Sequence, residues 1–130
     1  MATVNLYFAW TWMLAGMASG AVMGVFFYRH DWLGGFGSWR RRMVRLAHIA
    51  FFGTGLLNLG FALSWGLLER AGEPDPLLRV ASVLLIVGAV AMPTVCYAAA
   101  WRDPLRHLFF IPVVSLMGGV AALLAGGLLS

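Results

Sequence analysis

The sequence predicts an all-α integral membrane protein, a four-helix bundle with four transmembrane helices. The first observation is a set of four apolar runs, each 22 or 23 residues long, that contain no Asp, Glu, Lys or Arg. A helix rises about 1.5 Å per residue, so each run is long enough to cross a hydrocarbon core of about 30 Å. The second observation is composition: 62% of the residues are hydrophobic and 11% are charged, against about 25% charged in a soluble domain. The runs cover residues 6–28, 46–68, 80–101 and 108–129.

Flanking residues extend some of these runs, and we expect helices at about 6–28, 43–68, 79–101 and 105–129. The first of them carries no charged side chain, and neither do the five residues before it. It therefore lacks the basic region of a cleavable signal peptide, and we expect it to be retained as a span. The loops are too short to form a separate soluble domain, so residues 1–130 are expected to be one transmembrane domain.

The distribution of arginine predicts the orientation in the membrane. Seven of the nine arginines lie in the loops that follow the first and third runs. The positive-inside rule places these two loops in the cytoplasm and both termini on the non-cytoplasmic side. The net charge of +4 is thereby explained by topology, and we expect no nucleic-acid partner. All basic residues are Arg and none is Lys, which is typical of a GC-rich genome, so we expect a bacterial inner (plasma) membrane.

The first loop combines aromatic, glycine and basic residues. Glycines at 34, 35 and 37 oppose a stable helix there, and Trp32 and Trp39 are expected at the level of the lipid headgroups. Ser38 has the chemistry of an N-cap for the second helix. The run Arg40, Arg41, Arg42 is expected to contact anionic lipid headgroups, at about 1 kcal/mol per arginine, or the acidic face of a partner protein.

The second span carries a seam of residues spaced 3, 4, 3, 4 and 3 apart, which is the spacing of a helix-packing face. The two strongly polar side chains of this span, His48 and Asn58, both lie on the seam. An unpaired amide is costly in the membrane, so Asn58 must face another helix or a bound group. We expect an interhelical hydrogen bond there. The seam consists of His48, Phe51, Gly55, Asn58, Ala62 and Trp65.

Small residues at intervals of four predict close helix packing, because helices in lipid associate through close backbone approach. A four-helix bundle needs about two such faces. The sequence offers three, because the third span carries a heptad seam of Ala81, Leu84, Gly88, Ala91, Val95 and Ala98. One of the three faces is therefore expected to be available to another subunit. The packing residues are Gly16, Gly20 and Gly24 in the first span, Gly55 in the second, and Gly118, Ala122 and Gly126 in the fourth.

Histidine is the remaining residue type that could bind a cofactor. A haem b held by two histidines needs imidazoles from different helices at similar depth, and His48 and His107 satisfy the depth condition within about a turn. A chlorin or quinone contact at His48 or Asn58 is a further alternative. The lone Cys96 gives no disulfide or paired-cysteine metal site. We expect no bound cofactor, with haem b or a chlorin as the alternative, and no metal site.

These patterns predict a non-catalytic membrane protein. No catalytic residue set is visible, and no span contains the carboxylate that a proton- or sodium-coupled transporter normally needs. We expect a small accessory subunit of a larger membrane complex of respiratory or photosynthetic electron transport, with other membrane subunits and lipids as partners. The alternative is a small b-type cytochrome, or a quinone- or chlorin-contacting protein, that uses His48. A channel or carrier is the least favoured function.

Overall fold

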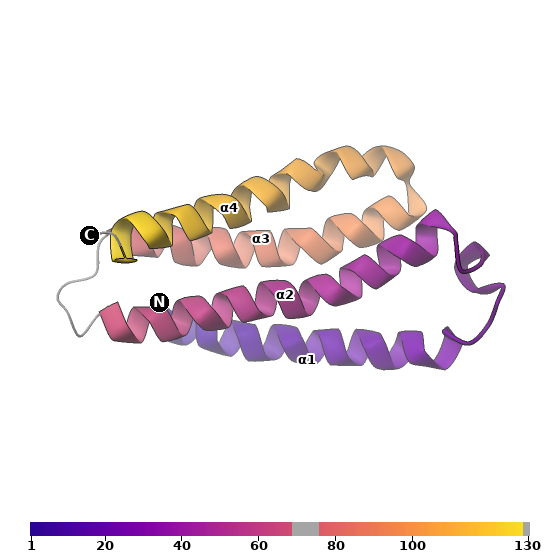
Figure 1. Cartoon of the computed structure of the whole chain (residues 1–130), viewed down its shortest axis with the longest axis horizontal. Coiled ribbons are helices and arrows are strands. Elements are labelled where there is room, and N and C mark those ends of the chain that lie inside the picture. Colours follow the sequence, from indigo (N-terminus) through magenta and orange to yellow (C-terminus); the bar gives the residue numbers. More distant parts are fainter. Residues whose placement is uncertain (69–75, 129–130) are drawn as a thin grey trace.

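A computed structural model describes residues 1–68 and 76–128 of the chain. It is all-α, with four long apolar helices packed as a bundle (Figure 1). Four helical spans are each long enough to cross a membrane, with mean hydropathies between 1.3 and 2.3. The fourth span, Asp103–Gly127, is longer than the α-helix at its centre, because it includes helical turns of other types at both ends. The fold class predicted from the apolar runs is therefore confirmed. The helices are α1 (Ala2–Phe26), α2 (Trp39–Leu68), α3 (Pro76–Trp101) and α4 (Phe110–Leu123).

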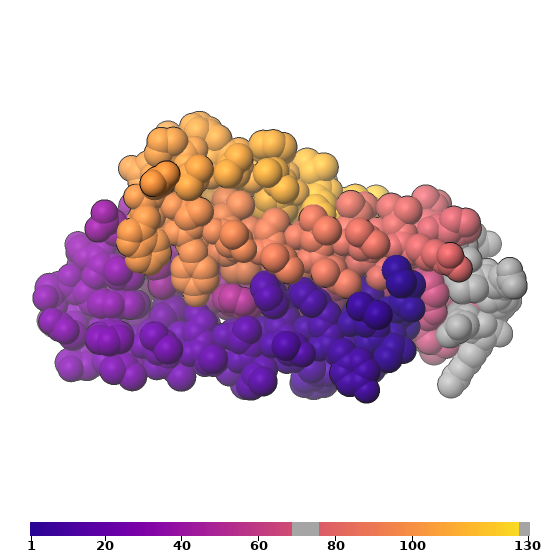
Figure 2. Space-filling model, turned by 180° about the vertical axis from the view of Figure 1, so that it is seen from behind, coloured from indigo at the N-terminus to yellow at the C-terminus, as the bar shows by residue number. Residues whose placement is uncertain are grey.

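The helices pack in the order of the sequence: α1 against α2, α2 against α3, and α3 against α4. The N-terminus and the end of α4 lie at one end of the bundle, and the α1–α2 loop lies at the other (Figure 1). We call the latter the basic end, because it carries seven of the nine arginines. From behind, α1 runs along the lower edge and the α3–α4 hairpin lies above it (Figure 2).

Two apolar clusters hold the helices together. The larger joins α2 to α3 through Phe61, Trp65, Leu78, Ala81 and Leu85, all of which are buried. The smaller lies toward the basic end and consists of Met23, Val44 and Ala100, one residue from each of the first three helices. Since helices in lipid gain little from hydrophobic burial, the stabilisation comes mainly from close packing of these side chains.

The helix ends differ from the predicted bounds by a few residues. α1 begins at Ala2 and α2 at Trp39, each four residues earlier than expected. The start of α2 follows from Ser38, whose hydroxyl accepts a hydrogen bond from the Arg41 N–H at 3.2 Å. This N-cap was predicted and is confirmed. In the preceding loop the chain forms a single 3-10 turn, Trp32–Gly34, and Gly34 and Gly35 both have positive φ.

The fourth span is the least regular. It begins with a 3-10 segment, Asp103–Phe109, and ends with a π-helical turn, Leu124–Leu128. Pro104 lies in the first turn of the 3-10 segment and Pro112 in the first turn of α4. Proline lacks the N–H that would continue an α-helical ladder, and the first turn is where that loss is tolerated. The predicted end of this span at residue 129 lies outside the described residues.

Candidate functional site

A groove of about 530 Å³ lies between α1 and α2 toward the basic end. On α1 the groove is open at Gly24, which has no atom within 4 Å of the position where a Cβ would stand. Tyr28 and Arg45 also line it. Most of the remaining lining is apolar. We call it the His48 groove, and the residues used below are Gly20, Gly24, Tyr28, Arg45 and His48.

Close approach of the two helices fixes the imidazole of His48. A Cβ at Gly20 would stand 2.6 Å from the His48 Cε1, so only glycine leaves room for the ring. The ring also packs edge-on against Phe52, with centroids 5.4 Å apart. Its Nδ1 is buried and has no hydrogen-bond partner in the described part of the chain. A buried polar atom without a partner is unusual in folded proteins and marks a candidate binding position.

The predicted histidine pair is not brought together. His107 is exposed on the 3-10 segment Asp103–Phe109, which packs against α3 and α4, whereas His48 lies between α1 and α2. A haem held by these two imidazoles therefore does not fit this arrangement. Among residues 1–68 and 76–128, no group of three His, Cys, Asp or Glu side chains could hold a metal ion. What the His48 groove offers is a slot for an apolar molecule that is lined in part by the His48 side chain.

Asn58 is completely buried and joins three helices. Its Oδ1 accepts a hydrogen bond from the Asn5 Nδ2 at 2.8 Å, and its own Nδ2 donates to the Leu85 carbonyl at 3.2 Å. Ser82 completes the cluster by donating its hydroxyl proton to the Asn5 Oδ1. The expected interhelical hydrogen bond is therefore present. Asn5 and Ser82 were missed from sequence, although a polar side chain at the edge of an apolar run was a signal for Asn5.

Most of the predicted packing residues have contacts inside the chain. A Cβ at Gly16 would meet Phe51 at 2.8 Å, and one at Gly55 would meet Met13 at 2.8 Å, so both serve the α1–α2 contact. In α4, a Cβ at Gly118 would stand 3.3 Å from Leu84 of α3. Ala122 packs beside the larger core cluster and Gly126 is buried in the π-helical turn. Gly24, in contrast, has nothing within 4 Å of its Cβ position, and contact of such a face with another subunit stays a prediction.

Arg41 corrects another expectation. Its side chain has 0% exposure, so it does not contact lipid or a partner as predicted for the run Arg40, Arg41, Arg42. It donates hydrogen bonds to the carbonyls of Phe27 and Arg29, and its guanidinium lies 3.8 Å from the centroid of the Phe36 ring. We call this arrangement the Arg41 cage.

The two neighbouring arginines of the run, by contrast, are exposed. The predicted interfacial tryptophans are half-buried, and both have contacts within the chain. Trp32 stacks on Phe26, with centroids 6.3 Å apart, and forms one wall of the Arg41 cage. Trp39 donates its indole proton to the Ala99 carbonyl at 2.7 Å, which ties α2 to α3.

A second apolar groove, of about 430 Å³, lies between α2 and α4 on the outside of the bundle. Beside it, α2 presents residues spaced 4, 3, 4, 3 and 4 apart, all of them exposed. The two glycines among them have nothing within 4 Å of a Cβ position. We call this set the outer stripe of α2. It consists of Ile49, Gly53, Leu56, Gly60, Leu63 and Leu67.

Comparisons of this chain with models of protein families, with curated proteins and with solved structures gave no match.

Proposed function

We propose that this chain is a small non-catalytic subunit of a larger membrane complex, and that a partner helix lies along the outer stripe of α2. The supporting observation is the pair of open glycines, Gly53 and Gly60, within a heptad-like row of exposed apolar residues. Glycine costs a helix up to about 1 kcal/mol relative to alanine, and lipid gains nothing from it. A neighbouring helix, in contrast, can approach a glycine face closely.

The groove between α2 and α4 supports the same proposal. Its lining is almost entirely apolar and includes Leu57, which lies between the two open glycines along α2. A partner helix seated there would contact both halves of the bundle. Respiratory or photosynthetic electron transport is the proposed setting, because the His48 groove is an apolar slot lined by one imidazole, which suits a quinone or chlorin ring at the edge of such a complex.

The test is native mass analysis of the tagged protein purified from its own membrane in mild detergent. The parent chain is expected to carry partner chains in fixed stoichiometry, and Gly60→Leu is expected to lose them, because the new side chain fills the path of the partner helix. Gly24→Leu is the matched control: it makes the same change at another open glycine, on α1, and is expected to keep the partners. A 14.1 kDa monomer for the parent would overturn the proposal.

A second candidate function, contact with a ring-shaped ligand through His48, is favoured by the unpartnered Nδ1. A visible spectrum of the same preparation identifies the ligand if it is a haem, which gives a Soret band, or a chlorin, which gives long-wavelength bands. A quinone is identified by solvent extraction. Gly24→Leu and His48→Ala are both expected to lose the ligand, whereas Gly60→Leu is expected to retain it unless the partner holds it. A preparation with its partners but without any extractable ligand would contradict this candidate.

A further inference from the structure

The two ring nitrogens of His48 have different surroundings. Nδ1 is buried and has no hydrogen-bond partner within residues 1–68 and 76–128. Nε2 has no hydrogen bond to this part of the chain either, but it is not enclosed as Nδ1 is. Because the His48 side chain lines the groove between α1 and α2, Nε2 is the nitrogen that a molecule in the groove can reach.

This difference favours one position for the imidazole proton. A neutral imidazole carries a single N–H, on Nδ1 or on Nε2, and the other nitrogen is an acceptor. With the proton on Nδ1, a buried N–H group would lack an acceptor, which is rare in folded proteins. With the proton on Nε2, only a lone pair is left unpaired at Nδ1. The N–H donor of His48 then stands at the groove.

We propose that the His48 groove binds a lipid-soluble quinone, one carbonyl of which accepts the Nε2 proton of His48. A histidine that ligates a metal almost always donates its other N–H to a nearby acceptor, and Nδ1 has no such acceptor in the described part of the chain. The groove therefore suits a carbonyl oxygen better than the metal centre of a haem or chlorin. This inference rests on the second candidate function above and names the ligand of that groove.

Arg45 provides a second donor beside the same groove. It lies three residues before His48, and residues at this spacing are neighbours on a helix face, with Cβ atoms about 5–6 Å apart. The Arg45 guanidinium lies over the ring of Phe27, 5.9 Å from its centroid. It makes no ion pair or hydrogen bond within the described residues. The two carbonyls of a para-quinone can thus meet two donors on α2.

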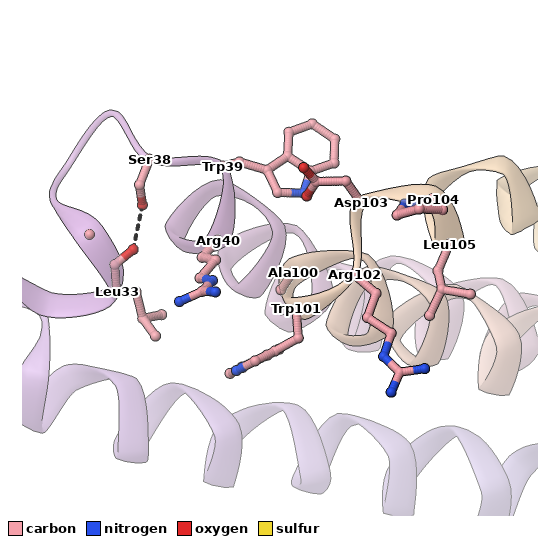
Figure 3. Close-up of a pocket in the computed structure, with 11 residues that line it drawn as sticks. Leu33, Ser38, Trp39, Arg40, Ala100, Trp101, Arg102, Asp103, Pro104 and Leu105 are labelled. Carbon is pink, nitrogen blue, oxygen red and sulfur yellow. Dashed lines mark hydrogen bonds between the residues drawn. The ribbon is translucent and has the colours of Figure 1, made fainter.

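The depth of the groove suits a ligand that arrives from the bilayer. The start of α2, beside a separate cavity at the basic end, is fixed by Ser38, whose hydroxyl donates to the Leu33 carbonyl at 2.7 Å (Figure 3). Trp39 follows, at the expected level of the headgroups. His48 lies nine residues further along the helix, a rise of about 13 Å. The groove is open to the outside of the bundle at Gly24, so a lipid-soluble ring can enter from the side.

The first experiment determines the proton position in the unmodified protein. The full chain is produced with isotope-labelled histidine and placed in nanodiscs, and nitrogen NMR compares the two ring nitrogens of His48. Loss of these signals in His48→Gln assigns them. The proton is expected on Nε2, and the Nε2 signal is expected to shift when decylubiquinone is added. A proton on Nδ1 would overturn the proposal.

The second experiment measures the binding of decylubiquinone to variants in the same nanodiscs. His48→Phe keeps a ring without the donor and is expected to weaken binding about fivefold, the size of one neutral hydrogen bond. His48→Gln keeps an N–H donor and is expected to bind more tightly than His48→Phe. His107→Phe is the matched control, because His107 is exposed outside the groove. Equal affinities of His48→Phe and His107→Phe would contradict the proposed hydrogen bond.

A metal-centred probe separates failure of this inference from failure of the candidate function on which it rests. Zinc protoporphyrin is expected to bind no more tightly to the parent than to His48→Phe. If its absorption bands shift in the parent but not in His48→Phe, the quinone assignment is wrong while the second candidate function stands. If neither probe binds the parent, both are wrong. Retention of partner chains is a separate readout, because these nanodiscs contain this chain alone.

Discussion

Individual polar residues fix how this apolar bundle is aligned. Asn58 was recognised from sequence as a residue that must face a helix, because an amide in an apolar run has nowhere else to bond. Its partners were not recognised, because they depend on how far the helices slide past one another. Asn5 stands just before the first apolar run, and Ser82 carries a common side chain in membrane helices. The hydrogen-bonded cluster of Asn5, Asn58 and Ser82 can be predicted only when the relative positions of the three helices along their axes are known.

Replacement of Asn58 by leucine is expected to lower the free energy of unfolding by about 1 kcal/mol, the magnitude of a hydrogen bond between membrane helices. The reason is that the Asn5 amide loses its acceptor and the Leu85 carbonyl loses its donor. Unfolding in bilayers by steric trapping measures the change. A double-mutant cycle with Asn5→Leu gives the control, and a coupling energy of zero would mean that the two amides do not interact.

The Arg41 cage is the second residue-scale feature, and sequence gave no means of finding it. In a run of three arginines nothing distinguishes the one that turns inward, since the choice depends on the path of the loop from Phe27 to Phe36. Arg41→Gln is expected to cost about 2 kcal/mol of stability, because hydrogen bonds from a charged group are worth about 1.5–3 kcal/mol. The exposed Arg42→Gln is expected to stay within about 0.5 kcal/mol of the parent, and equal costs for both would contradict the cage.

At the scale of the helices, hydropathy predicted the four spans well because 20 or more apolar residues in succession are compatible with little else. The helix ends were less accurate, since the helices continue into their polar flanks until a cap such as Ser38 stops them. The 3-10 segment Asp103–Phe109 was not predicted. The glycine intervals correctly indicated close packing, yet they do not say against which helix. Gly16 and Gly20 pack against α2 and Gly118 against α3, whereas Gly24 of the same first stripe is open.

Gly20→Ala tests the α1–α2 contact. The added Cβ would stand 2.6 Å from the His48 Cε1, and overpacking of this kind costs about 1–3 kcal/mol. Adding His48→Ala should restore the lost stability, because it removes the ring that the new methyl group strikes. Gly24→Ala is the control: with nothing within 4 Å, it should be neutral or slightly stabilising. If the double variant is no more stable than Gly20→Ala, the His48 imidazole is not the group that the added methyl clashes with.

The whole molecule is a serial bundle in which each helix packs mainly on the next. Sequence predicted the number of helices and the gathering of arginines at one end, because both follow from the order of apolar runs and arginines along the chain. It did not predict which faces remain exposed, because that requires the packing order and the rotation of each helix. The outer stripe of α2 can be recognised as an exposed row only once it is known that the seam on the opposite side of α2 packs against α1 and α3.

Orientation in the membrane is a prediction at this scale. The seven arginines of the basic end are expected in the cytoplasm, with the termini outside. Cysteines placed singly at Gly37 and Glu73 in a Cys96→Ala background should differ in labelling by a membrane-impermeant thiol reagent applied to intact cells. Gly37 is chosen because it is exposed with nothing within 4 Å. Labelling at Glu73 alone is the expected result, and labelling at Gly37 alone would invert the orientation.

The burial of Arg41 has a consequence for biosynthesis. Topology is decided while the nascent chain passes the translocation machinery, when Arg41 still stands among its neighbours as an ordinary exposed cation. In the folded protein the Arg41 side chain is buried, and its guanidinium donates hydrogen bonds to the Phe27 and Arg29 carbonyls. We expect the same side chain to act twice and in sequence: first as one of the orientation signals during insertion, and afterwards as a contact that holds the end of α1 against the start of α2.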